Sequence, residues 1–230
     1  MGIKISICIP TWEQHGYGKE FLKEMFDTIK KQTFKDFEVV ISDQSQNKEI
    51  EELVGVYKKI FPIFYIKNNN DLGNGPANTN NSIRYAKGKI IKIMFQDDLF
   101  VDDEALVKIY NAFMKEKCKW LVSGCNHTSD GKTFTREMIP SWNDEILIGV
   151  NTISSPSVLA YMNESPSFFD EKLTMLMDVE YYYQLYKKYG LPYIIADPLI
   201  SNRMHQYQVS SQYNKNINEE INYVKIKHKW

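Results

Sequence analysis

The chain has 230 residues, which suits one large domain or one domain with a small appendage. With 43% hydrophobic and 25% charged residues, its composition is that of a soluble globular protein with a sizeable core. The formal net charge of −1 gives no electrostatic reason for nucleic acid to be a partner.

The cysteine and hydropathy patterns favour a cytoplasmic protein. The three cysteines show neither CxxC nor metal-ligand spacing, so reduced thiols are the simplest interpretation. No apolar stretch approaches the length of a membrane span. Gly2 and Ser6 fit the loose myristoylation pattern M-G-x-x-x-S, but the same residues are typical of a first core strand. We therefore expect at most peripheral contact with a membrane.

In the first half of the chain, short apolar segments alternate with amphipathic ones. The predicted strands are residues 3–10, 37–43, 63–69 and 89–98, and the predicted helices are residues 17–33, 48–60, the end of 71–88, and 102–116. Four such cycles predict a parallel α/β sheet with right-handed crossovers.

After about residue 118 the alternation becomes less regular. The predictions there are strands at 119–125, 157–163 and 192–205, a hairpin turning at Asp130-Gly131, and a helix at 177–190 that Gly190 ends. Residues 214–230 predict a helical tail whose basic end is more typical of a solvated face than of a membrane anchor.

Polar residues follow the predicted strand ends: Thr11 and Glu13, then Asp43, then Asp97 and Asp98. In open α/β sheets ligands bind outside the carboxyl ends of the strands, so we expect these groups to share one crevice. Asp43 there could accept hydrogen bonds from a base or a ribose, or it could cap the next helix.

The adjacent carboxylates Asp97 and Asp98 repel each other, so the pair needs a compensating cation or full solvation. A divalent metal such as Mg²⁺ or Mn²⁺, with diphosphate oxygens as further ligands, satisfies this requirement. The alternative is that one of them caps the following helix, a role that Asp102 or Asp103 fills better.

Four residues of the second half carry candidate roles, each with an ordinary alternative. Asp178 could be a general base or a helix cap. His205 could bind metal or phosphate, and Arg203 could pair with phosphate, although a lone His is more often a surface or core residue. Trp142 could stack on a sugar or base, or simply cover the core.

Taken in order, five segments resemble family-2 glycosyltransferases of the GT-A fold, over roughly residues 3–210. The segments are ISICIPTWEQ, FEVVISDQSQ, NNNDLGNGPANTNNSIRYAKGKIIKIMFQDD, FDEKLTMLMDVEYYYQL and RMHQYQVS. They resemble the family's opening strand, its nucleotide-facing Asp, its approach to the acidic metal motif, its base segment and its diphosphate loop. The resemblance implies an α/β, GT-A-like (Rossmann-like), mostly parallel sheet flanked by helices, with a small mixed acceptor-side sheet.

The resemblance also implies an inverting, metal-dependent transfer from a nucleotide-sugar, with a UDP-sugar favoured, to a hydroxyl of a glycan or other acceptor. Asp178 is then the general base, and Asp98 with His205 holds Mn²⁺ or Mg²⁺. The residues expected at the donor are Pro10, Thr11, Glu13, Asp43, Gly73, Asn80, Asp97 and His205. Residues 1–212 would form one domain, with a nucleotide-sugar half (1–117) and an acceptor half (118–212), followed by the tail at 213–230.

The sequence departs from the family pattern at three positions. Phe95 stands where the first acid of D-x-D often lies, which leaves open whether Asp97 or Asp98 binds the metal; we prefer Asp98. Thr79 stands where an Arg often precedes the Asn. Met177 replaces the acidic neighbour that the base often has.

Three other functions compete with this interpretation. A nucleotidyltransferase would carry a basic, glycine-rich phosphate loop near its N-terminus, and residues 10–20 are a poor match. A phospho-acceptor signalling domain would need a lysine ending a late strand, and residues 192–201 offer none. A non-catalytic module that binds nucleotide-sugars or glycans is the remaining alternative.

Overall fold

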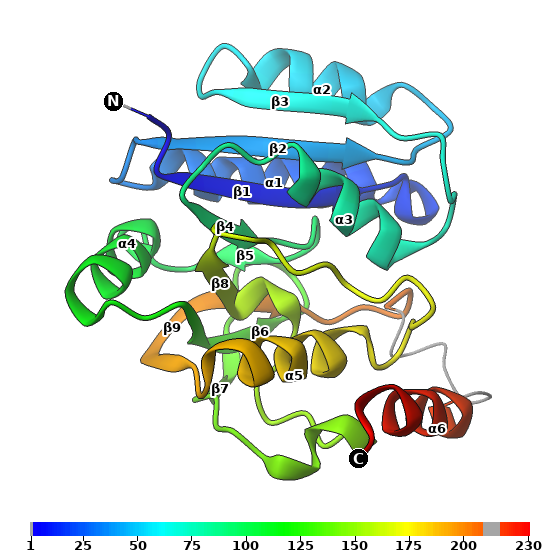
Figure 1. Cartoon of the computed structure of the whole chain (residues 1–230). Coiled ribbons are helices and arrows are strands. Elements are labelled where there is room, and N and C mark those ends of the chain that lie inside the picture. Colours follow the sequence, from blue (N-terminus) through cyan, green and yellow to red (C-terminus); the bar gives the residue numbers. More distant parts are fainter. Residues whose placement is uncertain (1, 209–216) are drawn as a thin grey trace.

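The computed structural model describes residues 2–208 and 217–230, and these residues form one continuous nine-stranded sheet with helices on both faces (Figure 1). The strands are β1 Ile5–Thr11, β2 Phe37–Asp43, β3 Ile63–Lys67, β4 Ile90–Ile93, β5 Leu99–Phe100, β6 Trp120–Thr128, β7 Thr135–Met138, β8 Leu159–Met162 and β9 Tyr193–Arg203. The helices are α1 Gly18–Lys31, α2 Glu49–Tyr57, α3 Gly75–Arg84, α4 Ala105–Glu116, α5 Met177–Tyr189 and α6 Ile217–His228, with short 3-10 turns η1 Gln14–Gly16, η2 Asp144–Ile148 and η3 Pro156–Val158.

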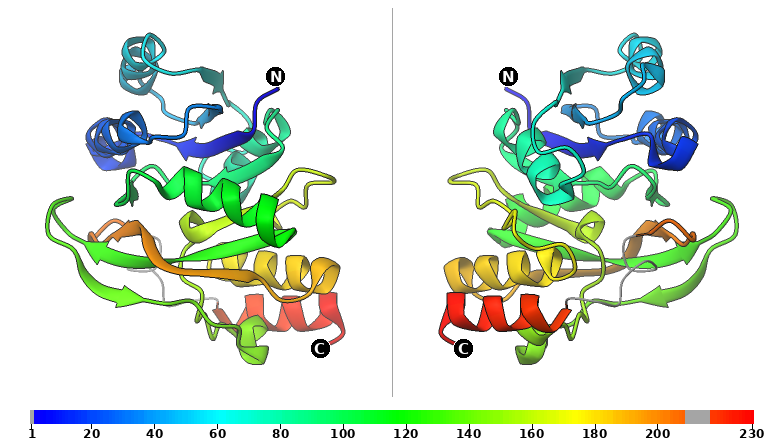
Figure 2. Two further views of the ribbon diagram at one scale, coloured as in Figure 1. Left: turned by 90° about the vertical axis from the view of Figure 1, so that its left-hand side faces the viewer. Right: turned by 90° about the vertical axis from the view of Figure 1, so that its right-hand side faces the viewer.

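The first half of the sheet is parallel, as predicted. β1 pairs in parallel with β2 and with β4, and β2 pairs in parallel with β3. The neighbours Ile7 and Cys8 of β1 point to opposite faces of the sheet and are both fully buried, because helices cover both faces of these strands. Figure 2 shows α1 and α2 on one side of this half and α3 on the other. The carboxyl ends of the strands therefore open along a single edge.

The second half of the sheet is mixed. β8 is antiparallel to both β4 and β6, and β9 is parallel to β6 but antiparallel to β5. The sheet order is β3-β2-β1-β4-β8-β6-β9-β5, with β7 paired to β6. The predicted α/β class is confirmed, and the mixed strands continue the parallel ones as a single sheet. Gly124 permits a close β6–β9 approach, since a Cβ there would lie 2.4 Å from Ala196 O.

The predicted tail helix forms α6, which lies beside α5 (Figure 2). Lys227 pairs with Asp170 (2.6 Å) and with the buried Glu180 (2.8 Å), so its basic end is packed in part rather than wholly solvated. The expected boundary at residues 212/213 lies outside the described residues. Within residues 2–208 and 217–230, no helix has the length and apolar character to cross a membrane.

Candidate functional site

The acidic pair follows β4 in a tight turn closed by the Asp98 N–H, which donates to Phe95 O (3.0 Å). Asp98 faces inward and is buried: its Oδ1 accepts from the Arg203 N–H (2.9 Å), and its Oδ2 from the Ser155 hydroxyl (3.4 Å). Burial raises the pKa of Asp98, and the Asp97 charge raises it further, whereas these bonds and one from Ser157 oppose the shift. Asp98 is thus held by the surrounding protein.

Asp97 lies on the open side of the same turn. Its Oδ2 is 2.9 Å from Nε2 of His205, and the two side chains are 16% and 12% exposed. A carboxylate oxygen and an imidazole nitrogen suit Mn²⁺, and such a cation often takes few protein ligands beside phosphate oxygens. Among the residues that the structure describes, no three His, Cys, Asp or Glu side chains group as a metal site. Two protein ligands alone would leave the other positions of such a cation to diphosphate oxygens.

Gln14, which sequence reasoning did not identify, completes this cluster. Its Nε2 lies 3.4 Å from Asp97 Oδ2 and 3.2 Å from His205 Nε2. Gln14, His15 and Gly16 all have positive φ (44°, 56° and 94°), a conformation that non-glycine residues adopt only when neighbours enforce it. Gln96 supplies part of that support, because its Nε2 donates to Gln14 Oε1 (2.5 Å). A lone glutamine gives no sequence signal for this role.

A buried lysine lies in the core next to the acidic turn. Lys92 of β4 is fully buried, and its Nζ donates to the backbone oxygens of Ser157 and Leu159. Burial lowers the pKa of Lys92 to about 7, while the Asp98 charge raises it. Lys92 is thus a buried amine whose protonation depends on the Asp98 charge.

Asp178 lies in the first turn of α5 and is only partly exposed. Its Oδ1 accepts from the Val179 N–H (2.7 Å), and its Oδ2 accepts from Asn151 Nδ2 (2.8 Å). Burial raises the pKa of Asp178 to about 6, with a smaller contribution from the Glu220 charge, while the bonds from Val179 and Asn151 lower it. A carboxylate with this pKa is ionised at neutral pH and able to accept a proton, which suits a general base.

The segment before α5 is held by the tail helix. The buried Glu220 of α6 accepts the N–H groups of Thr174 (3.0 Å), Met175 (3.0 Å) and Leu176 (2.9 Å). The carboxylate thus satisfies three consecutive backbone amides in the turn that leads into α5. The position of Asp178 at the start of α5 therefore depends on Glu220, which lies 42 positions later in the chain. No local sequence pattern indicates this contact.

Asp43 lies at the carboxyl end of β2, as predicted, but it is fully buried. Its Oδ1 accepts from the Ser45 hydroxyl (2.6 Å) and N–H (2.9 Å), and its Oδ2 accepts from the Tyr65 hydroxyl (2.7 Å) and from Lys67 (3.3 Å). These contacts fix the loop after β2. A direct bond from Asp43 to a nucleoside stays a prediction.

The predicted Pro10–Glu13 loop borders Asp43. Pro10 and Thr11 end β1, and the Thr11 hydroxyl donates to Asp43 Oδ1 (3.2 Å). Glu13 accepts the Gln46 N–H (3.0 Å), which ties this loop to the one after β2. The two loops therefore form a continuous rim along the strand ends.

Gly73 and Asn80 belong to the segment that forms α3. The Gly73 N–H donates to Gln44 Oε1 (3.2 Å), and Gly73 has a φ of 79°. Asn80 is buried, and its amide donates to Phe169 O and to Glu171 Oε1, both at 2.9 Å. Asn80 thus joins α3 to the chain that leads to α5, and its contact with a donor stays a prediction.

Arg203 and Trp142, which were candidates for binding phosphate and for stacking on a sugar or base, make contacts within the protein. The buried guanidinium of Arg203 donates to Asp97 O (3.0 Å) and pairs with Glu24, so it is engaged within the protein. Trp142 stacks on Tyr186, with ring centroids 4.3 Å apart, and covers the core.

At the helix start after the acidic turn, Asp102 Oδ1 accepts the Glu104 N–H (2.7 Å). The predicted alternative of Asp97 or Asp98 as the cap is therefore not needed.

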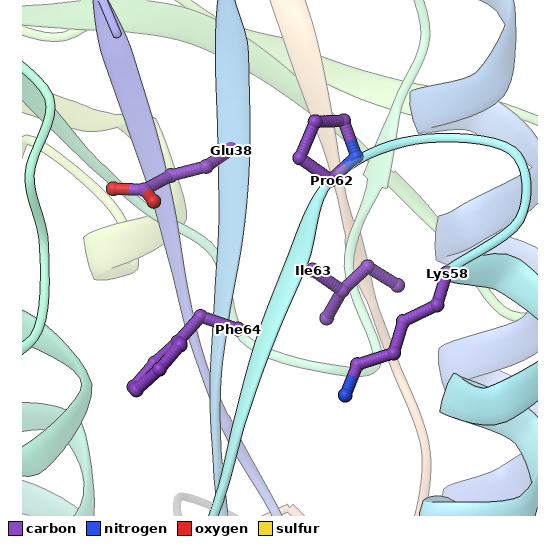
Figure 3. Close-up of a pocket in the computed structure, with 5 residues that line it drawn as sticks. All are labelled: Glu38, Lys58, Pro62, Ile63 and Phe64. Atoms are coloured by element: carbon purple, nitrogen blue, oxygen red, sulfur yellow. The ribbon is translucent and has the colours of Figure 1, made fainter.

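A surface hollow lies beside β2 and β3 (Figure 3). It is lined by Glu38, Lys58, Pro62, Ile63 and Phe64. Glu38 and Ile63 lie at the amino ends of β2 and β3, whereas Asp97 follows the carboxyl end of β4. The hollow is thus separate from the acidic cluster.

Comparisons with known proteins agree with this architecture. The family model described as Glycosyl transferase family 2 matches residues 6–173. An uncharacterized glycosyltransferase of Methanocaldococcus jannaschii, MJ1057, is 35% identical over 97 residues, which are 41% of this chain and 32% of that protein. The chain thus spans about a third of that relative's length.

Solved structures share the fold. S. aureus TarS 1–349 in complex with UDP-GlcNAc matches with a TM-score of 0.77 and 18% identity, over 97% of this chain and 66% of that chain. The mannosyltransferase PcManGT from Pyrobaculum calidifontis, in complex with GDP-Man and Mn²⁺, matches with a TM-score of 0.64 and 14% identity, over 90% of this chain and 58% of that chain. These matches confirm the predicted GT-A-like fold.

Proposed function

Because the chain belongs to glycosyl transferase family 2, we propose that it transfers a sugar from a nucleotide-sugar donor to an acceptor hydroxyl. The observation that carries the proposal is the Asp97–His205 contact of 2.9 Å, which brings an oxygen and a nitrogen ligand together beside the strand ends. Open α/β sheets bind nucleotides at this edge. A UDP-sugar is the favoured donor, in keeping with the UDP-GlcNAc of the TarS complex.

We assign the cation to Asp97 and His205, in place of the expected Asp98. Asp98 is buried and its two oxygens accept bonds from Arg203 and Ser155, whereas Asp97 is partly exposed. Mn²⁺ or Mg²⁺ bound there would act as a Lewis acid toward the departing diphosphate. Gln14 holds the two ligands together, and the inner carboxylate interacts electrostatically with the buried amine of Lys92.

Asp178 is the proposed general base of an inverting reaction. It accepts the proton of the acceptor hydroxyl while that oxygen forms a bond to the anomeric carbon. The bond between the anomeric carbon and the phosphate oxygen breaks, and the nucleoside diphosphate leaves with the electron pair. The support is the raised pKa of Asp178, about 6, which combines ionisation at neutral pH with a useful basicity.

The first test is the Asp178→Asn variant. We expect it to bind UDP-sugar and Mn²⁺ as the wild type does, seen as a rise in Tm, but to release UDP at least about 10²-fold more slowly, the scale of general-base catalysis. Asp36→Asn, at an exposed aspartate, is the control. Wild-type UDP release by Asp178→Asn would remove this residue from the mechanism.

The second test concerns the cation. Asp97→Asn and His205→Ala should each lower the Mn²⁺-dependent part of the Tm rise with a UDP-sugar, because each removes one proposed ligand. Donor-dependent stabilisation that is unchanged in both variants would contradict the assignment.

The remaining candidate is a non-catalytic module that binds nucleotide-sugars or glycans. Such a module would show the same rise in Tm with a donor but would release no UDP in the presence of Mn²⁺. A panel of nucleotide-sugars, assayed for both binding and release of the nucleoside diphosphate, separates the two functions.

A further inference from the structure

The loop between η2 and η3 touches the proposed base through one side chain. Asn151 Nδ2 donates to Asp178 Oδ2 (2.8 Å) and to Ser154 O (3.1 Å). Its Oδ1 accepts the N–H groups of Ile153 (2.9 Å) and Ser154 (3.0 Å). The carboxamide therefore uses its donor side on the base and its acceptor side on its own loop.

This loop has an unusual backbone conformation at Ser154, where φ is 100°. A non-glycine residue in this region is strained, and it persists only when surrounding contacts hold it. Besides the bonds to Asn151, Ser154 O accepts from the Tyr182 hydroxyl (3.0 Å) and Ser154 Oγ accepts from Asn202 Nδ2 (2.7 Å). The loop is thus fixed from α5 and from β9.

The same loop reaches the acidic turn. The Ser155 hydroxyl lies 2.8 Å from Asn202 Oδ1 and 3.4 Å from Asp98 Oδ2. Hydrogen bonds therefore run from Asp178 through Asn151, Ser154 and Asn202 to Ser155 and Asp98. The two carboxylates, which are 80 residues apart in sequence, are held by one short segment.

We propose that Asn151 is a positioning residue for the catalytic base, holding the Asp178 carboxylate at a fixed distance from the acidic turn. The inference rests on the proposed function, because it assigns to Asp178 the role of base. An asparagine fits this position because its carboxamide offers a donor to Asp178 and an acceptor to the loop.

The groups around Asp178 predict in which direction its pKa changes when each of them is replaced. The bond from Asn151 favours the ionised carboxylate, while the charge of Glu220 on α6 raises the pKa of Asp178. Tyr182 of α5 also faces Asp178 but stays protonated, since burial raises its pKa above the usual range. Loss of the Asn151 donor should therefore raise the pKa of Asp178, and neutralisation of Glu220 should lower it.

Two substitutions separate positioning of the base from support of the loop. Asn151→Asp keeps the Oδ1 acceptor for Ile153 and Ser154 but replaces the donor with an oxygen that repels Asp178. Asn151→Ala removes both functions. Asn143→Ala is the matched control, because Asn143 makes a similar bond to Glu145 N (2.8 Å) at the start of η2 without touching Asp178.

The first measurement is the carboxyl titration of Asp178, followed by ¹³C NMR of the protein labelled at aspartate. The signal is assigned by its loss in Asp178→Asn. We expect a wild-type pKa of about 6, an increase of about one pH unit in Asn151→Ala, a larger one in Asn151→Asp, a decrease in Glu220→Gln and no change in Asn143→Ala. Unchanged titration in both Asn151 variants would overturn the inference, whatever reaction the protein performs.

The second measurement is UDP release from UDP-GlcNAc with Mn²⁺. Both Asn151 variants should lose about 10-fold in kcat with little change in KM, because a displaced base slows the chemical step rather than donor binding. Full kcat in both variants, beside an active wild type, would overturn the inference. If the wild type releases no nucleoside diphosphate from any nucleotide-sugar, the proposed function fails, and the NMR titration still decides the Asn151 contact.

Discussion

Burial of the ionised Asp178 carboxylate lowers the stability of the folded protein at neutral pH, although the same carboxylate is the proposed catalytic base. Its pKa in the folded protein, about 6, is above the ordinary value of 3.8, so the native state binds a proton more readily than the unfolded chain. The stability gained from this tighter proton binding is fully present below about pH 4 and is lost as the pH rises through about 6. Asp178→Asn should therefore increase Tm, and by more at pH 8 than at pH 4. An equal increase at both pH values would contradict a desolvated carboxylate.

The same residue sets the acid limb of the activity profile. Protonation of Asp178 removes the base, so kcat/KM should fall tenfold per pH unit below about 6 and level off above it. The measurement is UDP release at low donor concentration between pH 4.5 and 8. A profile that stays flat across pH 6 would assign proton transfer to another group.

At the scale of elements, α6 acts as a brace for the start of α5. Glu220→Ala leaves the N–H groups of Thr174, Met175 and Leu176 without their carboxylate, which should lower the free energy of unfolding by about 2–3 kcal/mol. Glu219→Ala, at the exposed neighbouring position, should change it by less than about 0.5 kcal/mol. Urea denaturation of both variants gives the comparison, and equal stabilities would show that α6 contributes little through this contact.

Elements with a strong local pattern were predictable, and contacts between distant elements were not. The predicted strand at residues 37–43 has the same bounds as β2, because its seven residues are all buried and rich in β-branched side chains. The two residues of β5 are too few to give a periodic signal. Gln14 depends on three left-handed residues in a row, and Asn151 meets Asp178 across 27 positions. Such contacts follow from tertiary packing, which a single sequence does not encode locally.

At the scale of the whole molecule, the sheet makes the two halves one cooperative unit. β8 pairs with β4 on one side and with β6 on the other, so no strand boundary separates the two halves of the chain. We expect a single unfolding transition in urea, with the same midpoint by far-UV circular dichroism and by tryptophan fluorescence. Tryptophans report on both halves, since Trp12 follows β1 and Trp120 begins β6. Separate midpoints would show that the halves unfold independently.

Because the Lys92 amine is fully buried, its chemical reactivity would report how often the core around β4 opens transiently. An acylating reagent reaches a primary amine only where solvent can, and Lys92 is fully enclosed between β4 and η3. Most other lysines lie at the surface and react at once, so the late-labelled peptide containing Lys92 would time the opening of the central strands. Mass spectrometry along such a time course would follow these rare openings under native conditions, without any dye or engineered label.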